Sequence, residues 1–169
     1  MYPTQIDGFS IRHAVPADVP LILQFIRDLA EYEKLSHEVV ATEAALNEHL
    51  FGEVARAEVL IAEEKERAVG FALFFHNFST FLGRPGIYLE DLFVRPEDRG
   101  KGYGKALLTC LASIAKDRDC GRMEWCVLDW NQPAIEFYQS LGADLKRGWL
   151  VNRVTGDALQ QLALKFQEI

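Results

Sequence analysis

The sequence predicts an α/β protein in which one sheet carries helices on both of its faces. Two observations lead to this prediction. In the second half of the chain, segments with strand character are followed by segments with helical spacing of apolar residues, an order typical of sheets covered on both sides. In addition, a glycine-rich stretch joins one predicted strand directly to a helix. The 169 residues favour one domain, spanning residues 1–169.

The first half is predicted to begin with one strand and two helices. Residues 9–13 are expected to form the strand, and Pro16 begins the segment that opens the first helix. Thr42 is expected to cap a second, short helix over residues 44–50, with Ala45 at its third position. The first helix has one apolar face, made up of Val19, Ile22, Leu23, Ile26, Leu29 and Ala30.

Three strands are predicted in the middle of the chain. Residues 58–63 and 68–76 are expected to form a hairpin, joined by the charged turn at residues 64–67. Two glycines and a proline within residues 83–86 predict another turn. Residues 87–94, which are rich in apolar and aromatic side chains, are expected to form a central strand.

The second half is predicted to alternate between helices and strands. The helix after the glycine-rich stretch has an apolar stripe of Leu107, Leu108, Leu111, Ala112 and Ala115. Residues 123–128 are expected to form a strand, and Asn131 and Gly142 mark the start and the stop of the next helix. Residues 148–154 are expected to form a last strand. A C-terminal helix follows, with one face of Leu159, Leu162, Ala163 and Phe166.

Composition excludes several classes of protein. A formal net charge of -7 and a pI of about 5.1 argue against general nucleic-acid binding, which needs a broad basic face. The longest apolar run, residues 71–75, is far shorter than the roughly 18 residues of a membrane span, and the first ten residues do not resemble a signal peptide. Three cysteines without CxxC spacing suit reduced, buried thiols in a cytoplasmic protein, and four histidines without HxxH spacing predict no metal site.

The glycine-rich stretch is the strongest functional signal. Gly100, Gly102 and Gly104 alternate between a predicted strand and a predicted helix. A single glycine there would be a simple turn, but three allow the backbone to approach a ligand closely and to adopt positive φ. The free N–H groups of the first helical turn then point at an anion. We therefore expect a phosphate-binding loop.

Two well-known phosphate loops do not fit this stretch. A GxxxxGK[ST] loop ending at Gly104 and Lys105 would need glycine at Arg99 and a hydroxyl at Ala106. A GxGxxG loop would need glycine at position 105, and the stretch lies mid-chain rather than in a first βαβ unit.

Residues 99–104, RGKGYG, instead resemble the [RQ]xxGx[GA] pyrophosphate motif of the GCN5-related N-acetyltransferases, the GNAT superfamily. Residues 131–143 are similar to the NxxAxxFYxxxGF helix of that superfamily, except that Ala143 stands where phenylalanine is common. Residues 29–33, residues 88–94 and the WNQP stretch at 130–133 resemble the diamine (spermidine/spermine) and thialysine acetyltransferase branch more closely. The resemblance covers essentially the whole chain.

The resemblance implies both a fold and an activity. The fold is a mixed, mostly antiparallel sheet of six or seven strands, splayed in the middle, with helices on both faces. The activity is acetyl transfer from acetyl-CoA to a primary amine of a small molecule, namely a polyamine, a diamine or a lysine-like amino acid. The amine attacks directly in a ternary complex. The resemblance also implies a homodimer and no metal.

Similarity to the superfamily also assigns the cofactor contacts. The backbone N–H groups of the loop would hold the pyrophosphate, and the basic side chains of Arg99, Lys101 and Lys105 could add charge. The expected contacts of acetyl-CoA are Leu92, Phe93, Val94, Arg99, Gly100, Lys101, Gly102, Tyr103, Gly104, Lys105, Asn131, Pro133, Ala134 and Tyr138. Asn131 is explained equally well as a helix cap.

Acetyl transfer to an amine needs a base and an acid. An alkyl amine with a pKa of about 10.4 is neutral in only about one molecule per thousand or two at pH 7, so a base is useful. Glu90 is the expected base, with its proton affinity raised by partial burial, and Tyr138 is the expected donor to the leaving thiolate. Alternatively, Glu90 or Asp91 pairs with a basic residue and Tyr138 packs in the core. The expected acceptor residues are Arg27, Asp28, Tyr32, Glu33, Glu90 and Asp91.

Two other functions remain open at this point. A protein N-terminus or lysine could be the acceptor, which would require an open groove. A non-catalytic acyl-CoA module would keep the glycine-rich loop but lose a base and an acid, whereas Glu90 and Tyr138 are both present. The acidic residues on and after the first helix, Asp28, Glu31 and Glu33, would suit a cationic di- or polyamine, but they could equally be a solvated helix end.

Overall fold

The structure, a computed structural model, describes residues 1–168. The chain divides into two compact units, Met1–Cys126 and the residues from Val127 onward. The first unit contains the whole sheet and three α-helices, and the second contains two α-helices. No helix among the described residues is long and apolar enough to cross a membrane. The prediction of a single domain stays a prediction.

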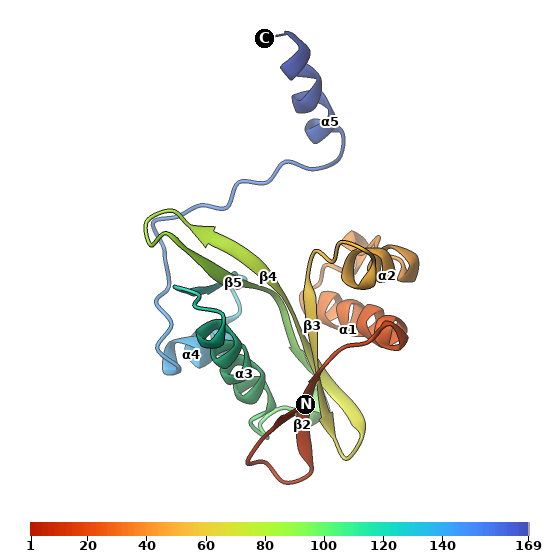
Figure 1. The fold of residues 1–169 in the computed structure, drawn as a ribbon, viewed down its shortest axis with the longest axis vertical. Helices are drawn as coiled ribbons and strands as arrows, with labels where there is room; N and C mark the ends of the chain where they lie inside the picture. Colours follow the sequence, from red (N-terminus) through yellow and green to blue (C-terminus); the bar gives the residue numbers. More distant parts are fainter. Residues whose placement is uncertain (169) are drawn as a thin grey trace. The chain divides into compact units, whose positions relative to one another are not determined.

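The first unit is built on one open sheet of six strands in the order β1-β2-β3-β4-β5-β6 (Figure 1). All neighbours from β1 to β5 are antiparallel, and β5 and β6 are parallel. The mixed, mostly antiparallel sheet is thereby confirmed. The strands are β1 (Tyr2–Pro3), β2 (Phe9–His13), β3 (Glu58–Glu64), β4 (Arg67–Ser79), β5 (Arg84–Val94) and β6 (Met123–Trp125).

Helices cover both faces of this sheet, as predicted. Helices α1 (Val19–Tyr32) and α2 (Glu43–Phe51) pack on one face, and α3 (Tyr103–Asp117) packs on the other (Figure 1). The alternation of side chains along β3 supplies both cores, because Leu60 belongs to the α3 side and Ile61 to the α1 side. Both side chains are completely buried.

An irregularity in β5 begins the candidate site. On the β4 side, Leu73 pairs with Asp91 and Phe74 with Leu89, so Glu90 is an extra residue in the ladder, a β-bulge. On the other side, β6 pairs with β5 only at residues 87–89. Beyond the bulge, β5 therefore continues without β6 beside it, and the sheet opens there.

The local signals for helix ends are confirmed in both units. Thr42 Oγ1 accepts a hydrogen bond from the Ala45 amide at 3.2 Å at the start of α2. In the second unit, Asn131 caps α4 (Gln132–Ser140), and Gly142 follows that helix with φ of 90°. The C-terminal helix is α5 (Gly156–Leu164), followed by a short 3-10 turn, η4 (Lys165–Glu168).

One predicted turn is misplaced, one predicted strand is shorter than expected, and a third predicted element, the last strand, is absent from the described structure. The turn lies at residues 80–83 rather than 83–86, because β5 already begins at Arg84, and Gly83 supplies its left-handed residue, with φ of 63°. Gly86 serves close packing instead, since a Cβ there would lie 2.4 Å from Asn77 Oδ1. The strand predicted over 123–128 ends at Trp125, where its pairing with β5 ends.

Residues 148–154 also form no strand, although their side chains are apolar enough for one. In the described part of the chain they pair with no other strand, and their side chains are exposed. The cysteines are free, as expected, but Cys126 is exposed rather than buried, and Cys110 and Cys120 are half-buried.

Candidate functional site

The glycine-rich loop forms an uncapped helix N-terminus. Gly100 and Gly102 both adopt left-handed backbone conformations, with φ of 78° and 89°. Gly102 is the N-cap of α3, and because glycine has no side chain it leaves the first-turn amides of the helix without a side-chain acceptor. The helix dipole adds partial positive charge at the same place. The loop is therefore suited to hold an anion with backbone N–H groups.

The side chain of Lys101 takes part in an ion-pair network beside this loop. Its Nζ lies 2.8 Å from Asp98 Oδ1 and 3.2 Å from Glu64 Oε2. Arg67, in the β3–β4 hairpin, also donates to Asp98 Oδ1 at 2.8 Å. Hydrogen bonds from Arg67 and Lys101 lower the pKa of Asp98 to about 2. The network ties the loop to the β3–β4 hairpin, so Lys101 braces the loop in this structure.

Asp98 was not among the predicted site residues, because the sequence does not show that this carboxylate is buried. Its side chain is only 1% exposed, and Oδ2 has no hydrogen-bond partner among the described residues. In the sequence it is one acidic residue in a charged stretch, and no local pattern marks it as buried.

The Arg99 side chain points away from the loop toward helix α1. Its Nε donates to the Val94 carbonyl oxygen at 3.1 Å, and its guanidinium carbon lies 4.5 Å from the centre of the Tyr32 ring. Lys105 is exposed on the first turn of α3. Of the three basic side chains expected beside the anion, two are thus held by protein groups in this structure.

The β5 side chains after the bulge are largely used for packing. Phe93 is 3% exposed and belongs to the α1 core, whereas Leu92 and Val94 pack against the α3 core. The Tyr103 ring stacks on Phe9 with ring centres 4.2 Å apart. These four predicted residues can serve a ligand mainly through their backbone groups.

Three carboxylates gather where the bulge meets the end of α1. Asp91 is half-buried, and burial together with the charges of Glu90 and Glu33 raises its pKa to about 6. Burial also raises the pKa of Glu33, which follows the last residue of α1. Glu90, at the bulge, is exposed, so its expected partial burial is wrong. The environment that favours a base belongs to Asp91.

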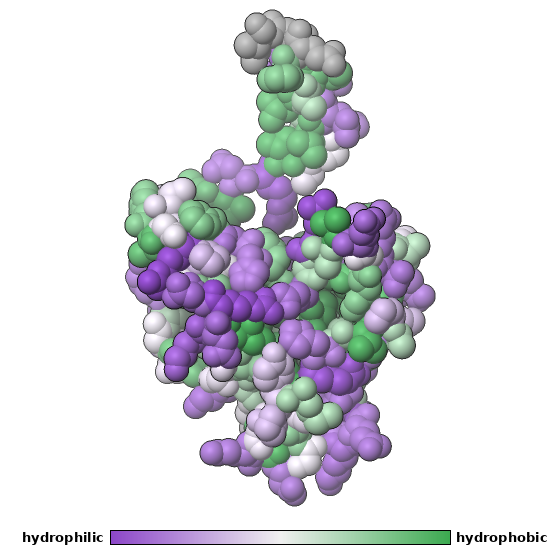
Figure 2. Space-filling view, in the orientation of Figure 1, coloured by the Kyte–Doolittle hydropathy of each residue, from purple (hydrophilic) through white to green (hydrophobic). Residues whose placement is uncertain are grey.

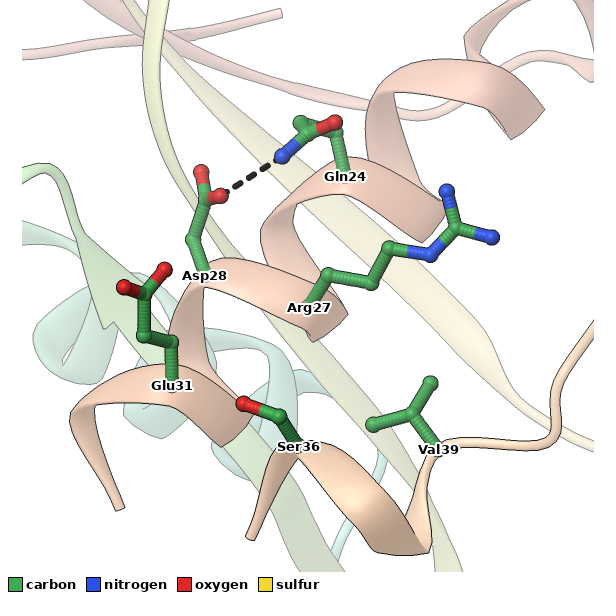
Figure 3. A pocket seen from close by; sticks show the side chains of 6 residues that line it. All are labelled: Gln24, Arg27, Asp28, Glu31, Ser36 and Val39. Carbon is green, nitrogen blue, oxygen red and sulfur yellow. Dashed lines mark hydrogen bonds between the residues drawn. The ribbon is translucent and has the colours of Figure 1, made fainter. Parts of the chain in front are cut away.

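A cavity on the outer side of α1 is lined by two more of the residues predicted to bind the acceptor, Arg27 and Asp28. The cavity encloses about 270 Å³ (Figure 3). Arg27 and Asp28 were predicted from the resemblance, whereas Ser36 and Val39 follow the helix and carry no sequence signal that could have found them. The complete lining is Gln24, Arg27, Asp28, Glu31, Ser36 and Val39.

The remaining predicted residues belong to the second unit. Asn131 is buried, and its Oδ1 accepts from the Ala134 amide at 3.4 Å, as a helix cap does. Pro133 lies in the first turn of α4, and Tyr138 lies on the same helix. The Tyr138 ring centre is 5.3 Å from that of Phe137, and both side chains are half-buried. The loop, the β5 residues and the α1 residues all belong to the first unit.

Comparison with known proteins gives consistent matches. The model of the acetyltransferase (GNAT) family matches residues 23–143. A thialysine N-epsilon-acetyltransferase from Bos taurus is 42% identical over 166 residues, covering 92% of this chain and 97% of the relative. An L-ornithine N5-acetyltransferase from Arabidopsis thaliana is 35% identical, covering 95% and 90%. The solved structure of an integron cassette protein from the mobile metagenome of V. cholerae superposes with a TM-score of 0.77 at 29% identity, covering 92% and 98%.

Proposed function

The chain belongs to the acetyltransferase (GNAT) family, and on that premise we propose that it transfers an acetyl group from acetyl-CoA to a primary amine of a small molecule. The amine attacks directly while both substrates are bound. One observation carries the proposal. Arg99, from the anion-binding loop, lies on Tyr32, the neighbour of Glu33, so the loop and the carboxylate cluster meet at the end of α1.

The first unit suits a phosphate-bearing thioester. The first-turn amides of α3 would hold the pyrophosphate, and the left-handed Gly100 and Gly102 leave them open. The backbone of residues 92–94, beyond the pairing with β6, would hold the extended arm of the molecule. When bound, acetyl-CoA supplies the reactive acetyl thioester.

The carboxylates attract the amine and take its proton. With a pKa of about 6, Asp91 is mostly ionised at pH 7 yet binds a proton more strongly than an ordinary carboxylate. Glu33 and the exposed Glu90 add negative charge that attracts an alkylammonium ion. We assign the proton transfer to Asp91, directly or through water, with Glu90 as the second candidate.

The Tyr138 hydroxyl donates a proton to the departing sulfur. A phenol with an ordinary pKa of about 10 is protonated at neutral pH and can donate. This role is supported by the likeness of residues 131–143 to the family's helix, and Asn131, Pro133 and Ala134 are proposed cofactor contacts on the same grounds.

Self-association is the proposed quaternary state. Many large apolar residues of the second unit are exposed. Among them, Trp149, Leu150 and Phe166 are 77%, 85% and 82% exposed. Figure 2 shows hydrophobic residues over much of α5. Apolar groups exposed on this scale usually mark an interface. We therefore propose a homodimer, and three free thiols fit a cytoplasmic enzyme.

An acceptor screen tests the proposed function. Purified protein is mixed with acetyl-CoA and with ornithine, lysine, 1,4-diaminobutane, spermidine or a lysine-containing peptide, and release of free thiol is followed. We expect release with one or more of the small amines and slower release with the peptide. Release with the peptide alone would identify a protein acetyltransferase and contradict the proposal.

A further inference from the structure

Strands β5 and β6 form a fork whose closed end lies next to the β-bulge. The two strands are parallel and pair only at residues 87–89 and 123–125, so the fork opens toward Val94 and the glycine-rich loop that follows it. In the proposed function, the loop holds the pyrophosphate and the backbone of residues 92–94 holds the extended arm. The arm would therefore enter the fork at its open end, and the acyl group that it carries would lie at the closed end.

Tyr88 and Asp91 share one face of the sheet at this closed end. On β5, Tyr88 lies between two residues of the α3 core, so its own side chain points to the α1 face. Asp91 pairs with Leu73, which packs against the α1 core, so Asp91 points to the same face. The two residues are three positions apart and share a face because the bulge adds Glu90 between them.

The Tyr88 side chain spans the closed end of the fork. Its ring centre lies 5.2 Å from that of Phe75, its partner across the ladder on β4. Its hydroxyl oxygen lies 3.1 Å from Sγ of Cys126, the residue that directly follows β6. The ring is thus supported from β4, and its hydroxyl ends beside the last residues of β6. Tyr88 and Cys126 together form an end wall on the face where Asp91 lies.

An end wall in this position limits the acyl group of the donor. An acetyl group ends in a single methyl, whereas each further methylene would extend toward Tyr88 and Cys126. Because Phe75 supports the Tyr88 ring, a longer chain would have to displace packed side chains, which is unfavourable. One methylene more or less in a fitted site changes discrimination between substrates about tenfold or more.

We propose that Tyr88 and Cys126 form the end wall of the acyl site and restrict the donor to short acyl groups, so that acetyl-CoA is used in preference to butyryl-CoA and longer thioesters. The proposal rests on the proposed function and defines its donor. Tyr88 and Cys126 are specificity residues that contact the methyl end of the acyl group, and Phe75 is a positioning residue that acts through Tyr88.

A series of donors tests the proposal with two widening variants. The ratio of kcat/KM for acetyl-CoA to that for butyryl-CoA is measured with one amine. Tyr88→Leu shortens the wall but keeps an apolar contact for Phe75, and the ratio should fall about tenfold or more. Cys126→Ala removes one sulfur at an exposed position and should lower the ratio less. Cys120→Ala, the same change at a half-buried cysteine outside the fork, should leave the ratio unchanged.

Tyr88→Phe separates a wall from a chemical role of the hydroxyl. The ring remains, so the preference for acetyl-CoA should be largely retained. An equal loss of rate with both donors in Tyr88→Phe would mean that the hydroxyl acts in the reaction, and it would overturn the assignment as a wall.

A binding measurement without amine separates this proposal from the proposed function. In calorimetric titrations, the wild type should bind butyryl-CoA more weakly than acetyl-CoA, and Tyr88→Leu should reduce this difference. CoA itself carries no acyl group and should bind equally to both proteins, which shows that the variant is folded. If the wild type transfers acetyl to no amine, the proposed function fails, whereas the titrations still test the wall. Equal wild-type affinity and equal kcat/KM for the two donors would overturn the wall and leave acetyl transfer intact.

Discussion

The guanidinium carbon of Arg99 lies 4.5 Å from the centre of the Tyr32 ring, while Arg99 Nε donates to the Val94 carbonyl oxygen at 3.1 Å. One side chain thus connects three elements, namely the glycine-rich loop, the end of β5 and the last turn of α1. Loss of this contact is expected to loosen the end of α1, which Glu33 follows and beside which Glu31 lines the cavity.

A double-mutant cycle measures this connection. Arg99→Ala and Tyr32→Leu should each raise KM for the amine, and the double variant should be less impaired than the sum of the two. A cation–π contact at an exposed site predicts a coupling of about 0.5–1 kcal/mol. Tyr32→Phe keeps the ring and serves as the control, with most of the coupling retained. Additive effects, with Arg99→Ala acting on the acetyl-CoA KM alone, would show that Arg99 serves only the cofactor.

The change in acetyl-CoA affinity when Asp98 is replaced shows which of two roles Lys101 has, a brace for the loop or a ligand of the phosphate. If Lys101 braces the loop, Asp98→Asn should weaken acetyl-CoA binding severalfold, because the loop loses its attachment to the β3–β4 hairpin. If Lys101 is instead a phosphate ligand that Asp98 withholds, the same variant should bind acetyl-CoA more tightly. Calorimetric titration decides between them. Glu97→Gln removes one negative charge at an exposed neighbour and controls for net charge.

Local signals in the sequence predicted most of the helices and the loop. Each of these features depends on residues only a few positions apart, and each is present in the structure. They are the apolar face of α1, the Thr42 cap of α2, and the limits of α4 at Asn131 and Gly142. The left-handed glycines before α3 were predicted for the same reason. Such features are decided by short-range geometry, which a sequence displays directly.

Features that depend on distant partners were not predicted. The bulge at Glu90 exists because β4 and β5 shift register, and beside this shift Asp91 is half-buried while Glu90 is exposed. The burial of Asp98 depends on Arg67, which is 31 residues away. Residues 148–154 carry a strand-like pattern, but a strand also needs a neighbour, and none pairs with them among residues 1–168.

Large apolar side chains that are exposed in the second unit predict self-association. Sedimentation analysis of the wild type should show a dimer at micromolar concentration. Leu150→Asp places a charge on an apolar side chain that is 85% exposed, and we expect it to shift the protein toward monomer. Val40→Asp makes the same kind of change at an equally exposed residue of the first unit and should leave the dimer intact. A monomeric wild type would contradict the proposed homodimer.

The proposed acid can be tested with a minimal substitution. Tyr138→Phe removes one hydroxyl and keeps the half-buried ring, so packing in α4 should survive. Loss of a general acid should lower kcat about a hundredfold, with little change in acetyl-CoA affinity. Single-turnover kinetics should show the loss in the chemical step. A chemical step as fast as in the wild type would remove Tyr138 from the mechanism.

The raised pKa of Asp91 predicts opposite effects on activity and on stability. Its pKa is about 6 in the folded protein, compared with an ordinary value of 3.8. The folded state therefore binds this proton more tightly than the unfolded state does. The stabilisation from this group is complete below about pH 4 and is lost as the pH rises through about 6.

Asp91→Asn should consequently stabilise the protein at pH 8 while it removes the proposed base. A difference of about two pKa units corresponds to an increase of up to about 3 kcal/mol in the free energy of unfolding at pH 8, with little change at pH 4. In contrast, kcat/KM for the amine should fall about a hundredfold and lose the component of its pH dependence that rises near pH 6. Denaturant unfolding and initial rates measure the two effects. Asp7→Asn, at an exposed aspartate, should change neither. If Asp91→Asn instead lowers stability at pH 8 and keeps the wild-type pH profile, Asp91 is a structural carboxylate, and the proton of the amine must pass to Glu90.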